Sequence, residues 1–134
     1  MVGAALLLGG CSGQAGLKAL DRAATPEDKL PPGITFQQDV KADSARLLAT
    51  RDGVRYFAAE NDDATVACVV VVPPDEDPRW MAGCSTLNTT GRIVEVSSVG
   101  SASATMLITD GSDTRKLESE GWTKVTDNIL VSGG

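Results

Sequence analysis

The sequence predicts a mainly β domain, in which hairpins build a small antiparallel curled sheet or sandwich with short helical turns. Turn signals recur about every 8 to 12 residues from Ser44 to Val131, a pattern typical of small all-β domains. The apolar runs between them are short and rich in β-branched residues, which favour strands. The alternative is an α+β fold in which residues 17–22 or 113–121 form a packed helix.

A central hairpin is predicted over residues 65–85. The run Val66–Val72 is β-branched and has the length of a buried strand, and Pro73 and Pro74 end it because neither can donate to a ladder. The matching register pairs Cys68 with Cys84, Val70 with Ala82 and Val72 with Trp80. We therefore expect this hairpin, with a loop over residues 73–79, to form the centre of the fold.

Further elements follow in chain order. Asp52-Gly53 lies between two apolar segments, which is a strong hairpin signal for residues 44–59. Ser85 is expected to cap a helical turn over residues 86–90 that Gly91 closes. The remaining predicted strands are residues 92–99 and 103–109 and a final hairpin over residues 122–131.

The 134 residues are enough for one domain with an N-terminal appendage. We assign residues 44–134 to the β-rich domain and residues 11–43 to a tether or N-terminal arm. Thr25-Pro26 followed by two acids predicts a short helix start. Two alternatives stay open for this segment: a spacer, or an ordered arm held against the domain by Ile34 and Phe36.

Net charge argues against two classes of electrostatic partner. The chain has a formal charge of −6, no histidine and no block of Lys or Arg. Nucleic acids and anionic lipid surfaces both attract basic clusters, so neither is an expected electrostatic partner. Membrane contact would therefore need a lipid or a helix.

The N-terminal residues supply a candidate lipid anchor. Residues 2–8 are apolar but too short to span a bilayer, and Leu8-Gly9-Gly10-Cys11 looks like a bacterial lipobox. This predicts a signal peptide over residues 1–10, acylation of Cys11 and a membrane-anchored, extracytoplasmic protein. The pattern departs from such signals in one respect, because no basic residue precedes the apolar run. The alternative is a buried apolar segment with Cys11 in a core.

Cysteine number agrees with export. If Cys11 is acylated, Cys68 and Cys84 remain as an even pair that can form a disulfide in an oxidising compartment. The alternative is two reduced, buried thiols.

Several short segments together resemble small, uncharacterised lipoproteins and membrane-anchored exported proteins of high-GC Gram-positive (actinobacterial) bacteria. The resemblance implies an extracytoplasmic location and no known activity. The residues that carry it are Leu20-Asp21-Arg22, Thr25-Pro26-Glu27-Asp28, Leu30-Pro31, Arg46-Leu47-Leu48, Asp52-Gly53, Tyr56 and Val66-Ala67-Cys68.

The chain offers little catalytic material. Without histidine, Ser-His and Cys-His couples are impossible, and neither a Ser-x-x-Lys dyad nor a Gly-x-Ser-x-Gly elbow occurs. Carboxylates remain, at Asp62-Asp63 and at Asp75-Glu76-Asp77, but neither loop has the spacing of a calcium-binding loop. We expect no cofactor and no metal.

The sequence therefore favours a non-catalytic binding or interaction module of the cell envelope, with an envelope protein or cell-wall material as the partner. The stiff loop that carries Asp75, Glu76, Asp77 and Arg79 is the predicted interaction loop. The alternative function is a carboxylate-based extracytoplasmic hydrolase, which would need two carboxyl groups in one cleft.

Overall fold

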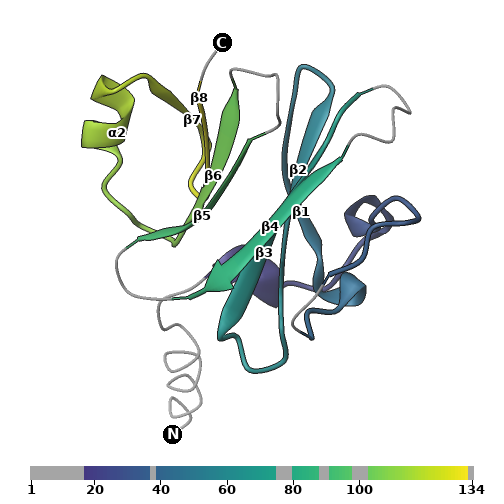
Figure 1. Cartoon of the computed structure of the whole chain (residues 1–134). Helices are drawn as coiled ribbons and strands as arrows, with labels where there is room; N and C mark the ends of the chain where they lie inside the picture. The colour runs from purple at the N-terminus through teal and green to yellow at the C-terminus, as the bar shows by residue number, and fades with distance from the viewer. Residues whose placement is uncertain (1–16, 37–38, 75–79, 88–90, 98–102, 133–134) are drawn as a thin grey trace, which may run out of the picture.

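The computed structural model describes residues 17–36, 39–74, 80–87, 91–97 and 103–132, and its fold is mainly β, as predicted (Figure 1). Two antiparallel four-stranded sheets make up the domain, in the orders β1-β2-β3-β4 and β5-β6-β8-β7. The strands of the first sheet are β1 Arg46–Arg51, β2 Val54–Glu60, β3 Val66–Val72 and β4 Met81–Thr86. Those of the second are β5 Arg92–Ser97, β6 Ala104–Ile108, β7 Trp122–Thr126 and β8 Ile129–Ser132.

The helical elements of the described residues are all short. Three are 3₁₀ turns before the first strand: η1 Lys18–Asp21, η2 Pro26–Asp28 and η3 Ala42–Ser44. The fourth, α2 Arg115–Ser119, lies on the outer side of the second sheet (Figure 1). Across the described ranges, no helix has the length and apolar character needed to cross a bilayer.

The strand β3 is buried on both faces, which explains its uninterrupted valine run. Ala67, Val69 and Val71 pack into the cluster between the two sheets. Cys68 and Val70 point the other way, into a cluster formed with the N-terminal segment. A strand covered on both faces needs no polar alternation, so the prediction of a fully buried central strand is confirmed.

Apolar side chains from both sheets fill the space between them, and Leu17 and Leu20 from the η1 region complete the cluster. At one side the strands β4 and β5 come very close. A Cβ atom on Gly83 would lie 2.5 Å from Cγ1 of Val96, so the approach requires a residue without a side chain. The buried members of the cluster are Leu17, Leu20, Tyr56, Ala58, Ala67, Val69, Val71, Ile93, Leu107 and Ile129.

The described part of residues 17–43 forms an ordered arm, which was one of the two alternatives for this segment. Its part from η2 to η3 lies along the side of the first sheet away from the second sheet (Figure 1), whereas Leu17 and Leu20 near η1 pack between the sheets. Leu30, Ile34 and Val40 are buried against the first sheet. Thr25 caps η2 in a capping box with Asp28, so the predicted helix start is present as a 3₁₀ turn. The arm therefore covers a sheet face that would otherwise expose valine.

The predicted hairpins are confirmed, with two corrections in detail. Asp52 and Gly53 both have positive φ, 54° and 84°, as a tight Asp-Gly hairpin turn requires. In the central hairpin Cys68 pairs with Cys84 and Val70 with Ala82, but the ladder ends at Val71 and Met81, one residue before the expected partner Trp80.

The second correction concerns the residues after the central hairpin. Ser85 and Thr86 continue strand β4 and do not begin a helical turn, because Thr86 pairs with Val66 and the Leu87 N–H donates to the Thr65 carbonyl over 2.8 Å. Residues 88–90 of the expected turn lie outside the described residues. Gly91 has a φ of 97°, the left-handed conformation that was expected of it.

Candidate functional site

Most of the predicted site residues lie outside the described ranges. These are Cys11, the expected lipidation site, and the interaction-loop residues Asp75, Glu76, Asp77 and Arg79. Among the predicted sites, the structure therefore describes only the surroundings of the disulfide.

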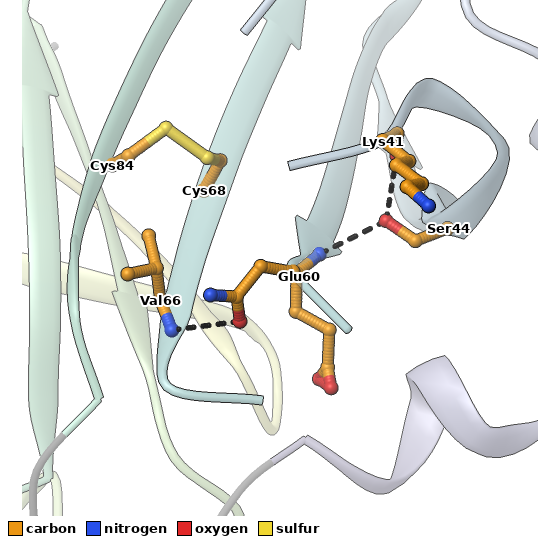
Figure 2. The surroundings of a disulfide bond; sticks show 7 residues. Lys41, Ser44, Glu60, Val66, Cys68 and Cys84 are labelled. Atoms are coloured by element: carbon orange, nitrogen blue, oxygen red, sulfur yellow. Dashed lines mark hydrogen bonds between the residues drawn. A yellow bond between two sulfur atoms is a disulfide. The ribbon is translucent and has the colours of Figure 1, made fainter. Parts of the chain in front are cut away.

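The disulfide joins Cys68 of β3 to Cys84 of β4, as predicted (Figure 2). Cys68 is fully buried against the arm, and Cys84 is half-buried beside it. Figure 2 also shows two hydrogen bonds that tie the end of β2 to the arm. The Glu60 N–H donates to the Ser44 hydroxyl, which donates in turn to the Lys41 carbonyl. A bond packed between a strand and the arm is placed to stabilise the fold. In the chain-entropy model, closing this 16-residue separation contributes about 3 kcal/mol.

An ion pair on the arm, between the exposed Arg22 and the buried Asp28, covers the edge of the first sheet. The Asp28 side chain is 2% exposed and accepts bidentate hydrogen bonds from Arg22, both 2.7 Å long. It also accepts from the N–H and hydroxyl of Thr25. Its hydrogen bond with Arg22, more than any other contact, holds the pKa of the Asp28 carboxyl well below its ordinary value, against the opposing effect of burial.

The same pair satisfies the outward backbone groups of Leu47 on the edge strand β1. The Leu47 N–H donates to Asp28 over 2.7 Å, and Arg22 donates to the Leu47 carbonyl over 3.2 Å. A strand edge with free N–H and C=O groups invites pairing with another chain. Arg22 and Asp28 act here as a side-chain substitute for a fifth strand, so this end of β1 is closed to partners.

The opposite end of the two-sheet structure is open and holds a cleft of about 730 Å³. One wall is the β1–β2 hairpin end, and the other is formed by the start of β7 and the end of β8. The lining residues are Arg51, Asp52, Val54, Tyr56, Ser103, Glu120, Gly121, Thr123, Val131 and Ser132. Its volume lies within the range of about 300 to 1,000 Å³ that is common for small-molecule sites.

Tyr56 is the most deeply placed polar side chain of the cleft. It is 7% exposed, its ring belongs to the cluster between the sheets, and it lines the cleft. Its hydroxyl makes no hydrogen bond to any described residue and is the tip of the side chain that reaches solvent in the cleft. Burial raises the pKa of Tyr56, while the nearby Arg51 lowers it to a smaller extent. The group is therefore a neutral hydroxyl available to a ligand.

Charged groups stand on both walls of the cleft. Arg51 and Asp52 come from the first hairpin, and Glu120 comes from the turn between α2 and β7. The Arg51 guanidinium has no hydrogen-bond or ion-pair partner within the described chain. Glu120 lies 4.0 Å from the ammonium of Lys116, an exposed contact of little energetic weight. The cleft can thus offer a cation, carboxylates and a neutral hydroxyl to one small molecule.

Of the two acidic loops singled out in the sequence, residues 75–77 lie outside the described residues, and among the described residues no group of three His, Cys, Asp or Glu side chains could hold a metal ion. Asp62 is paired with Lys41 at 3.2 Å, and both side chains are exposed. The neighbouring Asp63 is exposed as well. These two acids are exposed loop residues.

Sequence reasoning missed the cleft because its walls come from segments about 70 residues apart. The Asp-Gly turn signal located Arg51 and Asp52 at a hairpin end. Nothing local indicated that Glu120 would face that end, because this depends on how the two sheets pack.

A search with protein-family models, curated proteins and solved structures found no match to this chain.

Proposed function

We propose that this protein is a lipid-anchored, extracytoplasmic binding module of the cell envelope, and that its ligand occupies the cleft beside Tyr56. The observation that carries the binding role is the phenol itself: a side chain 7% exposed, lining a cleft, with its hydroxyl unpartnered among the described residues. The hydroxyl reaches solvent at the cleft, because no side-chain polar atom of the described residues is both buried and unpartnered, so it is free to exchange water for a ligand.

The position of the arm supports the anchor. Leu17 packs between the sheets at the end where the Lys18 N–H donates to Asp110 over 2.7 Å. The cleft lies at the other end, beside Asp52 and Ser132. Cys11 precedes Leu17 by six residues, which span at most about 20 Å. Acylation there would hold the η1 end near the membrane and turn the cleft toward the exterior.

A second candidate function, a carboxylate-based hydrolase, is favoured by one observation: Asp52 and Glu120 line the same cleft. A glycosidase pair needs one carboxyl whose proton is retained by burial in an apolar pocket. Asp52 and Glu120 are both exposed, so neither carboxyl lies in an apolar pocket. Binding therefore has the stronger support.

The anchor is tested by labelling with a fatty acid. Wild type should take up label and sediment with membranes, whereas Cys11→Ser should do neither. One acyl chain binds a membrane only marginally, so the two or three chains of a lipoprotein are needed for stable attachment of this acidic protein. A Cys11→Ser variant that still sediments with membranes would contradict the anchor.

The binding role is tested with the full-length Cys11→Ser protein. Its melting temperature is measured against a panel of short peptides, amino sugars and oligosaccharides, and each active compound is then tested on Tyr56→Phe. A thermal shift that disappears in Tyr56→Phe supports the cleft. Shifts that all persist in Tyr56→Phe and in Arg51→Gln would contradict it. Hydrolysis of a panel compound, seen by mass spectrometry and lost in Asp52→Asn or Glu120→Gln, would establish the hydrolase instead.

A further inference from the structure

We infer that the ligand of this cleft is a short peptide with a free carboxylate and a free amino group; this rests on the proposed binding function and names its ligand class. The structural basis is the charge arrangement of the two walls. The first sheet's wall carries the Arg51 cation, the neutral Tyr56 donor and the Asp52 carboxylate, and the turn before β7 carries the Glu120 carboxylate on the other wall. A molecule that carries both charges, separated by a few bonds, matches both walls at once.

The carboxylate side is formed by Arg51 and Tyr56. The guanidinium is a fixed cation whose geometry suits a carboxylate, and it has no competing partner within the described residues. The phenol is electrostatically coupled to it, since Arg51 lowers the pKa of Tyr56. An anionic oxygen between these groups would accept a charge-assisted hydrogen bond from each.

The amino side is formed by Glu120, whose position is fixed by the backbone. Its N–H donates to the carbonyls of Lys116 and Leu117 at the end of α2, and Gly121 follows with a φ of 108°. These constraints hold Glu120 at the cleft rim, where it can accept hydrogen bonds from an ammonium group. Asp52 adds a second negative charge to the same cleft.

The middle of the cleft suits small side chains and peptide groups. Val54 and Val131 are half-buried apolar residues of the lining, and Ser132 and Thr123 add hydroxyl groups. A cleft of about 730 Å³ accommodates a molecule of two or three residues with bridging water. A neutral sugar would use the hydroxyls but would leave Arg51 without a counter-charge.

The test is calorimetric titration of full-length Cys11→Ser with three probes: trialanine, N-acetyl-trialanine and trialanine amide. Trialanine should bind, and removal of either charge should weaken binding about tenfold or more, because each removes a charge-assisted contact. Arg51→Gln should abolish the difference between trialanine and its amide. Glu120→Gln should abolish the difference between trialanine and its acetylated form. Tyr56→Phe should weaken all three.

Matched controls lie outside the cleft. Arg55→Gln removes a cation from the opposite face of β2, where Arg55 stacks 5.6 Å from the ring centre of Phe57, and Asp62→Asn removes a loop carboxylate. Both should bind trialanine as the parent does. Equal affinity for all three probes, or affinities that Arg51→Gln and Glu120→Gln leave unchanged, would overturn the inference. If trialanine does not bind while a different compound gives a Tyr56-dependent thermal shift, the ligand class is wrong and the proposed function stands. If no compound gives one, both fail.

Discussion

Asp28→Asn should lower the free energy of unfolding more than most other single substitutions in the arm, although Asp and Asn side chains have the same shape. The Asp28 carboxylate accepts five hydrogen bonds. Its Oδ1 accepts from the Leu47 N–H and from one nitrogen of Arg22. Its Oδ2 accepts from the other Arg22 nitrogen and from the N–H and hydroxyl of Thr25. Whichever way the amide of asparagine turns, its NH₂ group faces at least two donors. A buried donor without a partner costs about 1 to 3 kcal/mol.

Breaking a buried ion pair typically costs about 3 to 5 kcal/mol, and the 42% exposure of the Arg22 side chain lets it turn to water. We therefore expect a loss of about 3 kcal/mol in the free energy of unfolding at pH 7. That is a large share of the roughly 5 to 15 kcal/mol that stabilises a domain. The assay is urea unfolding followed by circular dichroism, with Asp63→Asn as an exposed control that should change little.

The pH dependence gives the same substitution a second readout. The folded pKa of Asp28 is depressed, so its contribution is complete above its unfolded pKa of about 3.9 and is lost as pH falls toward the folded value. The parent should therefore lose stability between about pH 5 and pH 2, and Asp28→Asn should lose less. A loss below about 1 kcal/mol at pH 7, together with an unchanged acid dependence, would refute the assignment of Asp28 as the residue that closes the β1 edge.

Three further outcomes follow from the described contacts. Reduction of the disulfide between Cys68 and Cys84 should lower stability by about 3 kcal/mol, seen as a lower melting temperature with reductant; no change would contradict its structural role. Gly83→Ala should lower the free energy of unfolding in urea by about 1 to 3 kcal/mol, because the added Cβ meets Val96. Adding Val96→Ala should restore much of this loss; no restoration would mean that the two residues do not approach each other closely. An ultraviolet pH titration should show that the pKa of Tyr56 lies above its ordinary value near 10. The free energy of unfolding should therefore be independent of this group below pH 10 and should fall as pH rises further. An ordinary pKa would mean that the phenol is well solvated.

The parts of the fold that depend on local pattern were predictable. Val66–Val72 has the length and composition of a buried strand, and the two cysteines fix its register with β4. Asp52-Gly53 specifies a turn because its backbone needs positive φ at both positions. The turn signal is local and the two cysteines are 16 residues apart along one hairpin, so both could be interpreted without the tertiary structure.

The arm and the cleft depend on contacts between distant segments, so the sequence could not settle them. Leu30, Ile34 and Val40 follow no helical or strand period, since each reaches the sheet from an irregular backbone. Asp28 was expected as a helix-start acid, but its hydrogen bond to Leu47 is made 19 residues away. Glu120 belongs to the cleft only because the second sheet packs with its β7–β8 end toward the first hairpin.

The central claim, that the cleft beside Tyr56 is the binding site, is tested most directly by nuclear magnetic resonance of the ¹⁵N-labelled, full-length Cys11→Ser protein titrated with trialanine. The account predicts progressive shifts of the backbone amides of Arg51, Gly121 and Ser132, which line the cleft, and none at Asn61 or Asp62 in the loop at the other end of β2. The same titration of Tyr56→Phe should give smaller shifts at equal peptide concentration. Saturating shifts clustered around Asn61 and Asp62, with the cleft amides unchanged, would contradict it.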